Sequence, residues 1–158
     1  MKKILLPLLL GASLSANAGN PEVDRLADKI EPEVIKWRRH FHQYPELSNR
    51  EFETAKTIAK YLESLGLEVQ TGIAKTGVVA VLDSGKPGPV VALRADIDAL
   101  PVTEAVDLPF ASKVRTTHEG FDVGVMHACG HDTHIAMLMG AAKILTTMKG
   151  QLKGKVKF

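Results

Sequence analysis

Eight consecutive residues carry an unusual density of side chains that can bind metals. The run HACGHDTH contains His127, Cys129, His131 and His134, together with Asp132. Imidazole nitrogen and thiolate sulfur are ligands that zinc and neighbouring transition metals prefer, and a carboxylate can bind directly or orient an imidazole. If the segment is extended, its side chains alternate between faces, so His127, Cys129 and His131 would point to one side. The pattern favours a metal site over a buried thiol beside a surface histidine.

The roles within this cluster follow from its place before a helix. An apolar helix is expected from about Thr133 to Thr147, and its N-terminus would favour anions, lower the pKa of a thiol and keep imidazoles neutral. We therefore predict that Cys129 and His131 are metal ligands. For His127 and His134 the sequence leaves a direct and a supporting role open.

A second polar cluster follows the apolar run from Val90 to Leu93, which predicts a buried strand. Arg94, Asp96 and Asp98 come directly after it, and ligands of open α/β sheets bind beyond the carboxyl ends of strands. The two carboxylates can accept an imidazole N–H and fix its tautomer, or can merely cap a turn. We expect Arg94 to pair with one of them rather than to bind a substrate carboxylate.

Two helices are expected to precede these clusters. Apolar residues recur at intervals of three and four from Val23 to Phe41, with Pro32 as a point where the helix can break or kink. At its end, Arg38, Arg39, His40 and His42 are interpreted as a solvated face with one hydrogen-bonded histidine. Ser48 to Glu51 matches a capping box, so a second helix should start there and end at Gly66.

The remaining segments predict strands. We expect two short strands, Leu67 to Val69 and Val78 to Leu82, around a turn at Thr76 and Gly77. The Lys-rich end of the chain, including Lys155 to Phe158, is expected to form a strand with one solvent-exposed face. The helix from Thr133 to Thr147 is apolar on most sides and should lie in the core. Helices and strands in this order predict an α/β fold with a mixed sheet flanked by helices.

The first eighteen residues have the pattern of a secretory signal. Lys2 and Lys3 precede the apolar run Ile4 to Leu14, and Ala16-Asn17-Ala18 resembles a cleavage site. The run is shorter than the roughly 20 apolar residues that cross a membrane. We expect cleavage after Ala18, export to the periplasm or the medium, and residues 19–158 as the mature part, without a membrane anchor.

Charge and cysteine content restrict the partners of the exported part. The 158 residues hold 20 Lys and Arg against 18 Asp and Glu, and loss of Lys2 and Lys3 would leave equal numbers, so no nucleic-acid-binding surface is indicated. Cys129 is the single cysteine and has no partner for an internal disulfide. Occupation by a metal would explain why a thiol persists in an oxidising compartment.

Three motifs together resemble one enzyme family. They are WRRHFHQYPELS from Trp37, LRADIDALP from Leu93 and MHACGHD from Met126. In this order they are similar to the amidohydrolase branch of the aminoacylase and carboxypeptidase metallopeptidases, which includes hippurate hydrolase, N-acyl-amino-acid amidohydrolases and auxin-conjugate hydrolases. The match covers nearly all of residues 19–158.

The resemblance implies a catalytic domain with two divalent metals that polarise an amide carbonyl and activate a water. Carried over by position, Cys129 and His131 would be metal ligands, and the side chains expected to support them are those of Asp96, His127, Asp132 and His134. The implied substrate is an N-acyl amino acid. Zinc, manganese, cobalt and nickel stay open as the metal, as do the acyl group and the amino acid.

Family members continue beyond the position of Phe158. There they supply a pair of glutamates, of which the first is the general base, two further histidine ligands, and a lid or dimerisation domain through which the intact enzyme can form a homodimer. We therefore expect residues 19–158 to be the N-terminal part of such a catalytic domain. By themselves they should lack the general base, be inactive, and expose apolar edges.

Two other functions remain as alternatives. The chain can be a non-catalytic domain that binds metal or a partner chain, which would fold and take up metal without turnover. It can also be a hydrolase with Cys129 as the nucleophile, activated by a helix N-terminus and a nearby imidazole. The short separation of Cys129 and His131 makes the usual arrangement of a separately oriented base awkward, so the second alternative ranks lower.

Overall fold

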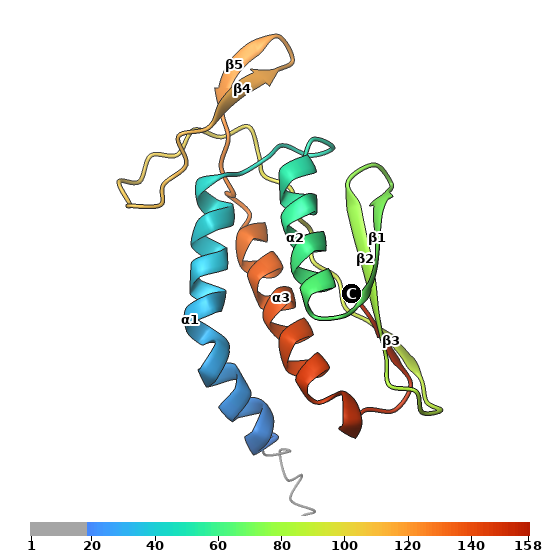
Figure 1. The fold of residues 1–158 in the computed structure, drawn as a ribbon. Helices are drawn as coiled ribbons and strands as arrows, with labels where there is room; N and C mark the ends of the chain where they lie inside the picture. Colours follow the sequence, from blue (N-terminus) through green and yellow to red (C-terminus); the bar gives the residue numbers. More distant parts are fainter. Residues whose placement is uncertain (1–18) are drawn as a thin grey trace, which may run out of the picture.

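The computed structural model describes residues 19–158, so the expected signal sequence lies outside the described part. Three helices and a four-stranded mixed sheet form the body (Figure 1). The α/β fold expected from the sequence is therefore confirmed. The elements, in chain order, are α1 (Pro21–Gln43), α2 (Phe52–Ser64), β1 (Glu68–Ile73), β2 (Gly77–Asp83), β3 (Val90–Ala92), β4 (Arg115–His118), β5 (Phe121–Gly124), α3 (His131–Thr147), a 3-10 turn (Lys149–Gln151) and β6 (Lys155–Lys157).

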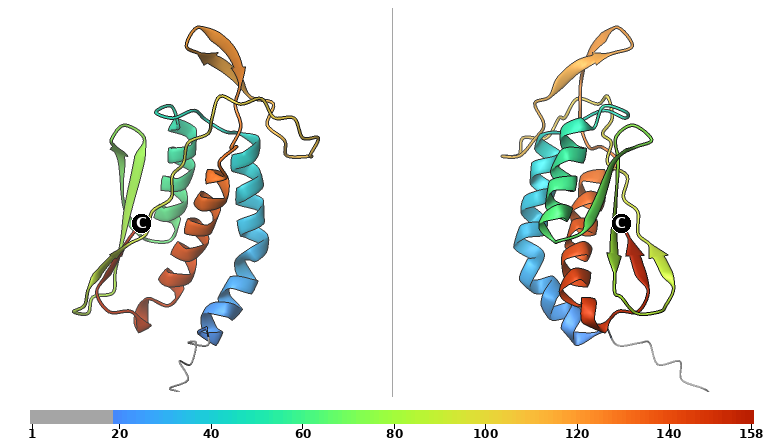
Figure 2. Two further views of the ribbon diagram at one scale, coloured as in Figure 1. Left: turned by 180° about the vertical axis from the view of Figure 1, so that it is seen from behind. Right: turned by 45° about the vertical axis from the view of Figure 1, so that its right-hand side comes forward.

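The elements of the body are layered, with α3 between α1 and the sheet. Two further views show α1 on one side of α3, and the sheet with α2 on the other (Figure 2). Phe41 of α1 packs against Ile135 and Met139 of α3. The close approach of the two helices is allowed by Gly140, since a Cβ atom there would lie 3.0 Å from Val34 Cγ2. The C-terminal end of α1 thereby comes to lie beside the N-terminal end of α3.

Helix α1 runs through Pro32 without interruption. The Asn20 side chain accepts a hydrogen bond from the Glu22 N–H at 3.0 Å, and Pro21 occupies the first turn, where its missing N–H costs nothing. Packing of the buried Ile30 and Phe41 on either side of Pro32 holds the helix together. Of the two outcomes expected at Pro32, a break is thus excluded.

The capping box expected at the start of α2 is wrong. Glu51 is the N-cap residue itself, and its carboxylate accepts from Asn49 N–H and, at 2.7 Å, from the buried Thr76 hydroxyl. The free N–H groups of the first turn go instead to Glu46, whose carboxylate oxygens lie 3.3 Å from Glu53 N and 2.8 Å from Thr54 N. A residue before the turn therefore caps the helix.

The sheet has the order β1-β2-β6-β3, so the last strand of the chain lies between two earlier ones. Strand β6 pairs antiparallel with β2 and parallel with β3. As expected, Lys155 and Lys157 are exposed. The strand expected from Val90 to Leu93 is present as β3, but the expectation that it is buried is wrong. Val90 is 65% exposed and Val91 49%, because β3 pairs with β6 alone among the described strands.

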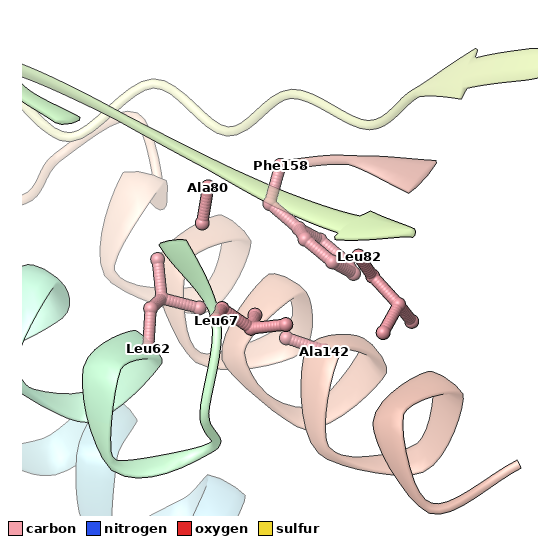
Figure 3. Close-up of a cluster of buried hydrophobic side chains, with 6 residues drawn as sticks. All are labelled: Leu62, Leu67, Ala80, Leu82, Ala142 and Phe158. Atoms are coloured by element: carbon pink, nitrogen blue, oxygen red, sulfur yellow. The ribbon is translucent and has the colours of Figure 1, made fainter. Parts of the chain in front are cut away.

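A cluster of six buried side chains joins the sheet to the helices (Figure 3). Leu62 of α2 and Ala142 of α3 face Ala80 and Leu82 of β2, and Phe158 closes the cluster from the end of β6. Leu67 is the sixth member. This packing confirms α3 as a core helix, although Met137 on its outer side is 54% exposed.

Strands β4 and β5 form a hairpin that the sequence patterns do not predict. It projects from the end of the body where α1 ends and α3 begins (Figure 1). Glu119 and Gly120 form its turn with φ values of 51° and 84°. Within residues 19–158, no helix is both long and apolar enough to cross a membrane.

Candidate metal centre

The histidine and cysteine cluster forms a turn between β5 and α3. Gly130 is the N-cap of α3 with a φ of 82°, a left-handed conformation that favours glycine, and its carbonyl accepts from Thr133 N–H and His134 N–H. His131 is consequently the first residue of the helix. Cys129, one residue before the N-cap, is a free and exposed thiol. The two predicted ligands thus lie together at a helix N-terminus that faces solvent.

The imidazole of His131 is held by Asp98. Its Nδ1 lies 3.0 Å from both the carbonyl oxygen and the Oδ1 atom of Asp98. With Nδ1–H as the donor, the neutral ring carries its lone pair on Nε2, which is the arrangement that metal-ligating histidines commonly adopt. The geometry therefore leaves one nitrogen of His131 available for a metal.

Asp96, expected from the resemblance to support a metal ligand, does not make this contact. Its Oδ1 lies 2.5 Å from Arg94 Nη2, and the arginine is 85% exposed. The expected ion pair of Arg94 with one of the two aspartates is confirmed. Strand-like alternation cannot distinguish Asp96 from Asp98, because both would project to the same side. The irregular segment that follows β3 brings Asp98 to His131.

The two other histidines of the cluster lie in contrasting environments. His134 is exposed on α3, with its ring centroid 5.4 Å from that of His131. His127 is only 4% exposed, and neither of its ring nitrogens has a hydrogen-bond partner among residues 19–158. Burial lowers the pKa of His127 from its usual 6.5 to about 4, although the Asp132 carboxylate opposes the shift. A neutral imidazole with free nitrogens is thus enclosed behind the turn.

Asp132 anchors the first turn of α3 to α1. It is 1% exposed, and its Oδ2 atom accepts from Arg38 Nε at 3.0 Å and pairs with His42 Nδ1 at 2.8 Å. Its other oxygen, Oδ1, is buried and has no hydrogen-bond partner within the described part of the chain. The expectation of one hydrogen-bonded histidine among the basic residues of α1 is met by His42. The expectation of a solvated face for the other basic residues holds for Arg39 and His40, which are exposed, but is wrong for Arg38, which pairs with the buried Asp132.

A buried glutamate on the far side of His42 was not found by sequence reasoning. The Glu104 side chain is 2% exposed, lies 3.2 Å from His42 Nε2 and accepts from Ser112 N–H at 2.7 Å. The Ser112 hydroxyl in turn donates to the Val125 carbonyl at 2.7 Å. Phe110 of the same segment lies against the guanidinium groups of Arg38 and Arg39. The sequence offers only a weak signal for it, since Glu104 lies in a mostly apolar segment from Leu100 to Phe110 that also holds Asp107.

The donor chemistry of the turn fits a divalent transition metal. Cys129 offers a thiolate, His131 a ring nitrogen whose partner nitrogen is fixed, and the enclosed His127 has two unpartnered nitrogens. Among residues 19–158, no three histidine, cysteine or acidic side chains converge closely enough to hold an ion by themselves. The described residues therefore fit a metal as a pair of adjacent donors with an orienting carboxylate.

Comparison with known proteins supports the interpretation of the turn as part of a metal site. Residues 92–158 match the family described as peptidase family M20/M25/M40. The chain is 45% identical to the N-acyl-L-amino acid amidohydrolase of Geobacillus stearothermophilus, over 87% of this chain and 35% of that protein. It is 49% identical to thermostable carboxypeptidase 1 of Saccharolobus solfataricus, over 82% and 31%. The resemblance predicted from the three motifs is confirmed.

A solved structure shares the fold. The Bacillus subtilis YXEP protein, described as a dinuclear metal binding peptidase from the M20 family, is 45% identical and superposes with a TM-score of 0.73 over 83% of this chain and 34% of that one. The chain thus spans about a third of the length of the relatives it matches.

Proposed function

Because the chain shares its motifs and its fold with peptidase family M20/M25/M40, we propose that residues 19–158 supply part of the metal site of an enzyme that hydrolyses the amide bond of N-acyl amino acids. The observation that carries the proposal is the Cys129–His131 turn, where an exposed thiol stands beside an imidazole whose Nδ1 is held 3.0 Å from Asp98. Such a pair suits zinc, manganese, cobalt or nickel.

The residues of this chain have distinct parts in that chemistry. Cys129 and His131 would hold the metal, which when bound polarises an amide carbonyl and lowers the pKa of a water. Asp98 accepts a hydrogen bond from the Nδ1–H group of His131, which keeps the Nε2 atom of that ring free for a metal. His127, which burial keeps neutral, presents a lone pair rather than a charge behind the turn.

The substrate class is supported by what the relatives are called. One is an N-acyl-L-amino acid amidohydrolase and another a carboxypeptidase. Both names describe hydrolysis of an amide bond that involves an amino acid. A site that polarises an amide carbonyl is the shared requirement of these reactions. We propose N-acyl amino acids as substrates on that basis.

The first experiment measures metal content and hydrolysis of N-acetyl amino acids by the intact protein that contains these residues. We expect divalent metal in the parent, loss of metal and of hydrolysis in Cys129→Ser, and retention of both in His118→Gln, which alters the hairpin next to its turn. Metal-free parent protein that hydrolyses the substrate would contradict the proposal. Activity that survives a chelator but is lost on alkylation of Cys129 would instead indicate a cysteine nucleophile.

We also propose that the protein is exported. Residues 1–18 lie outside the described part of the structure, so support comes from Lys2-Lys3, the apolar run and the Ala16-Asn17-Ala18 site alone. N-terminal sequencing of the protein recovered from outside the cytoplasm should begin at Gly19. A mature protein that begins at Met1 would contradict this.

A further inference from the structure

His42 connects two buried carboxylates that come from segments far apart in the chain. Its Nδ1 lies 2.8 Å from Asp132 and its Nε2 3.2 Å from Glu104, and the three side chains are 5%, 1% and 2% exposed. Both ring nitrogens therefore face acceptors, which an imidazolium can satisfy by donating from each. With Arg38 also on Asp132, the two carboxylates, which would be costly to bury alone, have hydrogen-bonding partners from α1.

The two contacts of His42 connect it to the two ends of the segment 126–131. On one side Asp132 directly follows His131. On the other, Glu104 accepts from Ser112, whose hydroxyl donates to the Val125 carbonyl, two residues before His127. The segment 126–131, which contains both predicted metal ligands, is thus held at its start and at its end by hydrogen bonds that meet at one imidazole.

We propose that His42 is a positioning residue of the metal site, which fixes the Cys129–His131 turn through Asp132. This inference rests on the proposed function, because it assumes that the turn binds metal. Loss of the contact would allow the first turn of α3 to move while the Asp98 contact still holds the ring of His131. Partners that orient ligands in this way typically change metal affinity by about 10- to 100-fold.

Two amide substitutions separate the two contacts. The amide nitrogen of asparagine takes the place of Nδ1, so His42→Asn retains the hydrogen-bond donor toward Asp132 and loses the contact with Glu104. The amide nitrogen of glutamine takes the place of Nε2, so His42→Gln retains the contact with Glu104 and loses the donor toward Asp132. In the intact protein we expect the metal dissociation constant to rise about 10- to 100-fold in His42→Gln and less in His42→Asn. His40→Gln, on the exposed side of the same helix, is the matched control and should match the parent.

A second measurement does not need metal. Cys129 is exposed, so its alkylation rate in metal-free protein reports the geometry of the turn, and we expect a changed rate in His42→Gln but not in His40→Gln. A parent-like rate and affinity in folded His42→Gln would overturn the proposal. So would equal losses in the asparagine and glutamine variants, which would assign the effect to packing of the ring.

The failure of the proposed function can be told apart from the failure of this inference. A parent that binds metal without cleaving N-acyl amino acids refutes the substrate class, while the affinities of the variants still decide the role of His42. If the parent binds no metal, the positioning of a metal site is refuted with it. Should His42→Gln not fold, Asp132→Asn replaces it, since it keeps the size of the side chain but removes the carboxylate charge that His42 and Arg38 contact. It should likewise raise the dissociation constant.

Discussion

At the scale of single residues, the candidate site depends on which side chain orients each metal donor. The sequence was sufficient to propose Cys129 and His131 as metal ligands, because of their types and spacing. The resemblance gave the supporting role to Asp96, whereas the structure places Asp98 against His131, since the two aspartates differ only in the path of the chain after β3. The sequence could not pair His42 with Glu104, since the contact joins residues 62 positions apart and no local pattern records it.

Replacement of Asp98 tests the orientation of His131. Asp98→Ala removes the Oδ1 acceptor but leaves the backbone carbonyl of residue 98, which also lies 3.0 Å from Nδ1. We therefore expect metal affinity to fall by about tenfold, the lower end of the usual range for such partners. Asp96→Ala is the control, and competition with a chromophoric chelator is the measurement. An equal effect of Asp96→Ala would show that the two aspartates are not distinguished in the way the structure indicates.

The buried His127 should make the metal-free protein sensitive to acid. Its pKa is about 4 when folded and 6.5 when exposed, so the unfolded chain binds more protons between these values. This proton uptake leaves the free energy of unfolding unchanged above pH 6.5. As the pH falls toward 4, it lowers the free energy of unfolding by at most about 3 kcal/mol. Urea unfolding of the parent and of His127→Leu at several pH values measures it. The leucine variant should lose less stability with acid, and parallel slopes would contradict the prediction.

At the scale of elements, helix starts show where local patterns mislead. The Ser48–Glu51 pattern has the residue types of a capping box, yet the Glu51 carboxylate binds the Thr76 hydroxyl, a contact 25 residues along the chain. Glu46 takes over the free N–H groups of α2 from outside the helix. By contrast the start of α1 followed the local rule, because Asn20 and Pro21 act on their nearest neighbours alone. Local chemistry predicts a cap only where no distant group competes.

The cap supplied by Glu46 has a measurable effect on stability. Glu46→Ala leaves the N–H groups of Glu53 and Thr54 without their acceptor, and loss of a cap costs about 1 kcal/mol. Glu46→Gln, which keeps one acceptor oxygen, should cost less. Glu53→Ala is the control, because Glu53 pairs with Lys56 at the surface, where such pairs contribute little. Chemical unfolding gives these values; an unchanged stability of Glu46→Ala would show that water caps the helix equally well.

At the scale of the whole molecule, the order along the chain of the three helices and the strands of the sheet followed from hydrophobic patterns, whereas the hairpin of β4 and β5 and the order within the sheet did not. Each strand is short, and nothing in the pattern of β6 says that it enters between β2 and β3. That arrangement depends on packing of Phe158 with Ala80 and Leu82 over α3. The same arrangement explains why Val90 and Val91 are exposed, since β3 is an edge of the described sheet.

An exposed apolar edge predicts how residues 19–158 behave when produced alone. Strand β3 offers free backbone groups together with Val90 and Val91, which favours pairing of strands between copies. We expect association that increases with concentration in sedimentation velocity, and Val91→Lys should suppress it by placing a charge at the edge. Val106→Lys is the matched control, because Val106 is similarly exposed, at 52%, but lies in a loop. If both lysine variants reduce association equally, general hydrophobicity rather than the strand edge drives the association. A chain that stays monomeric would show that the edge is already protected by its twist or by its flanking charges.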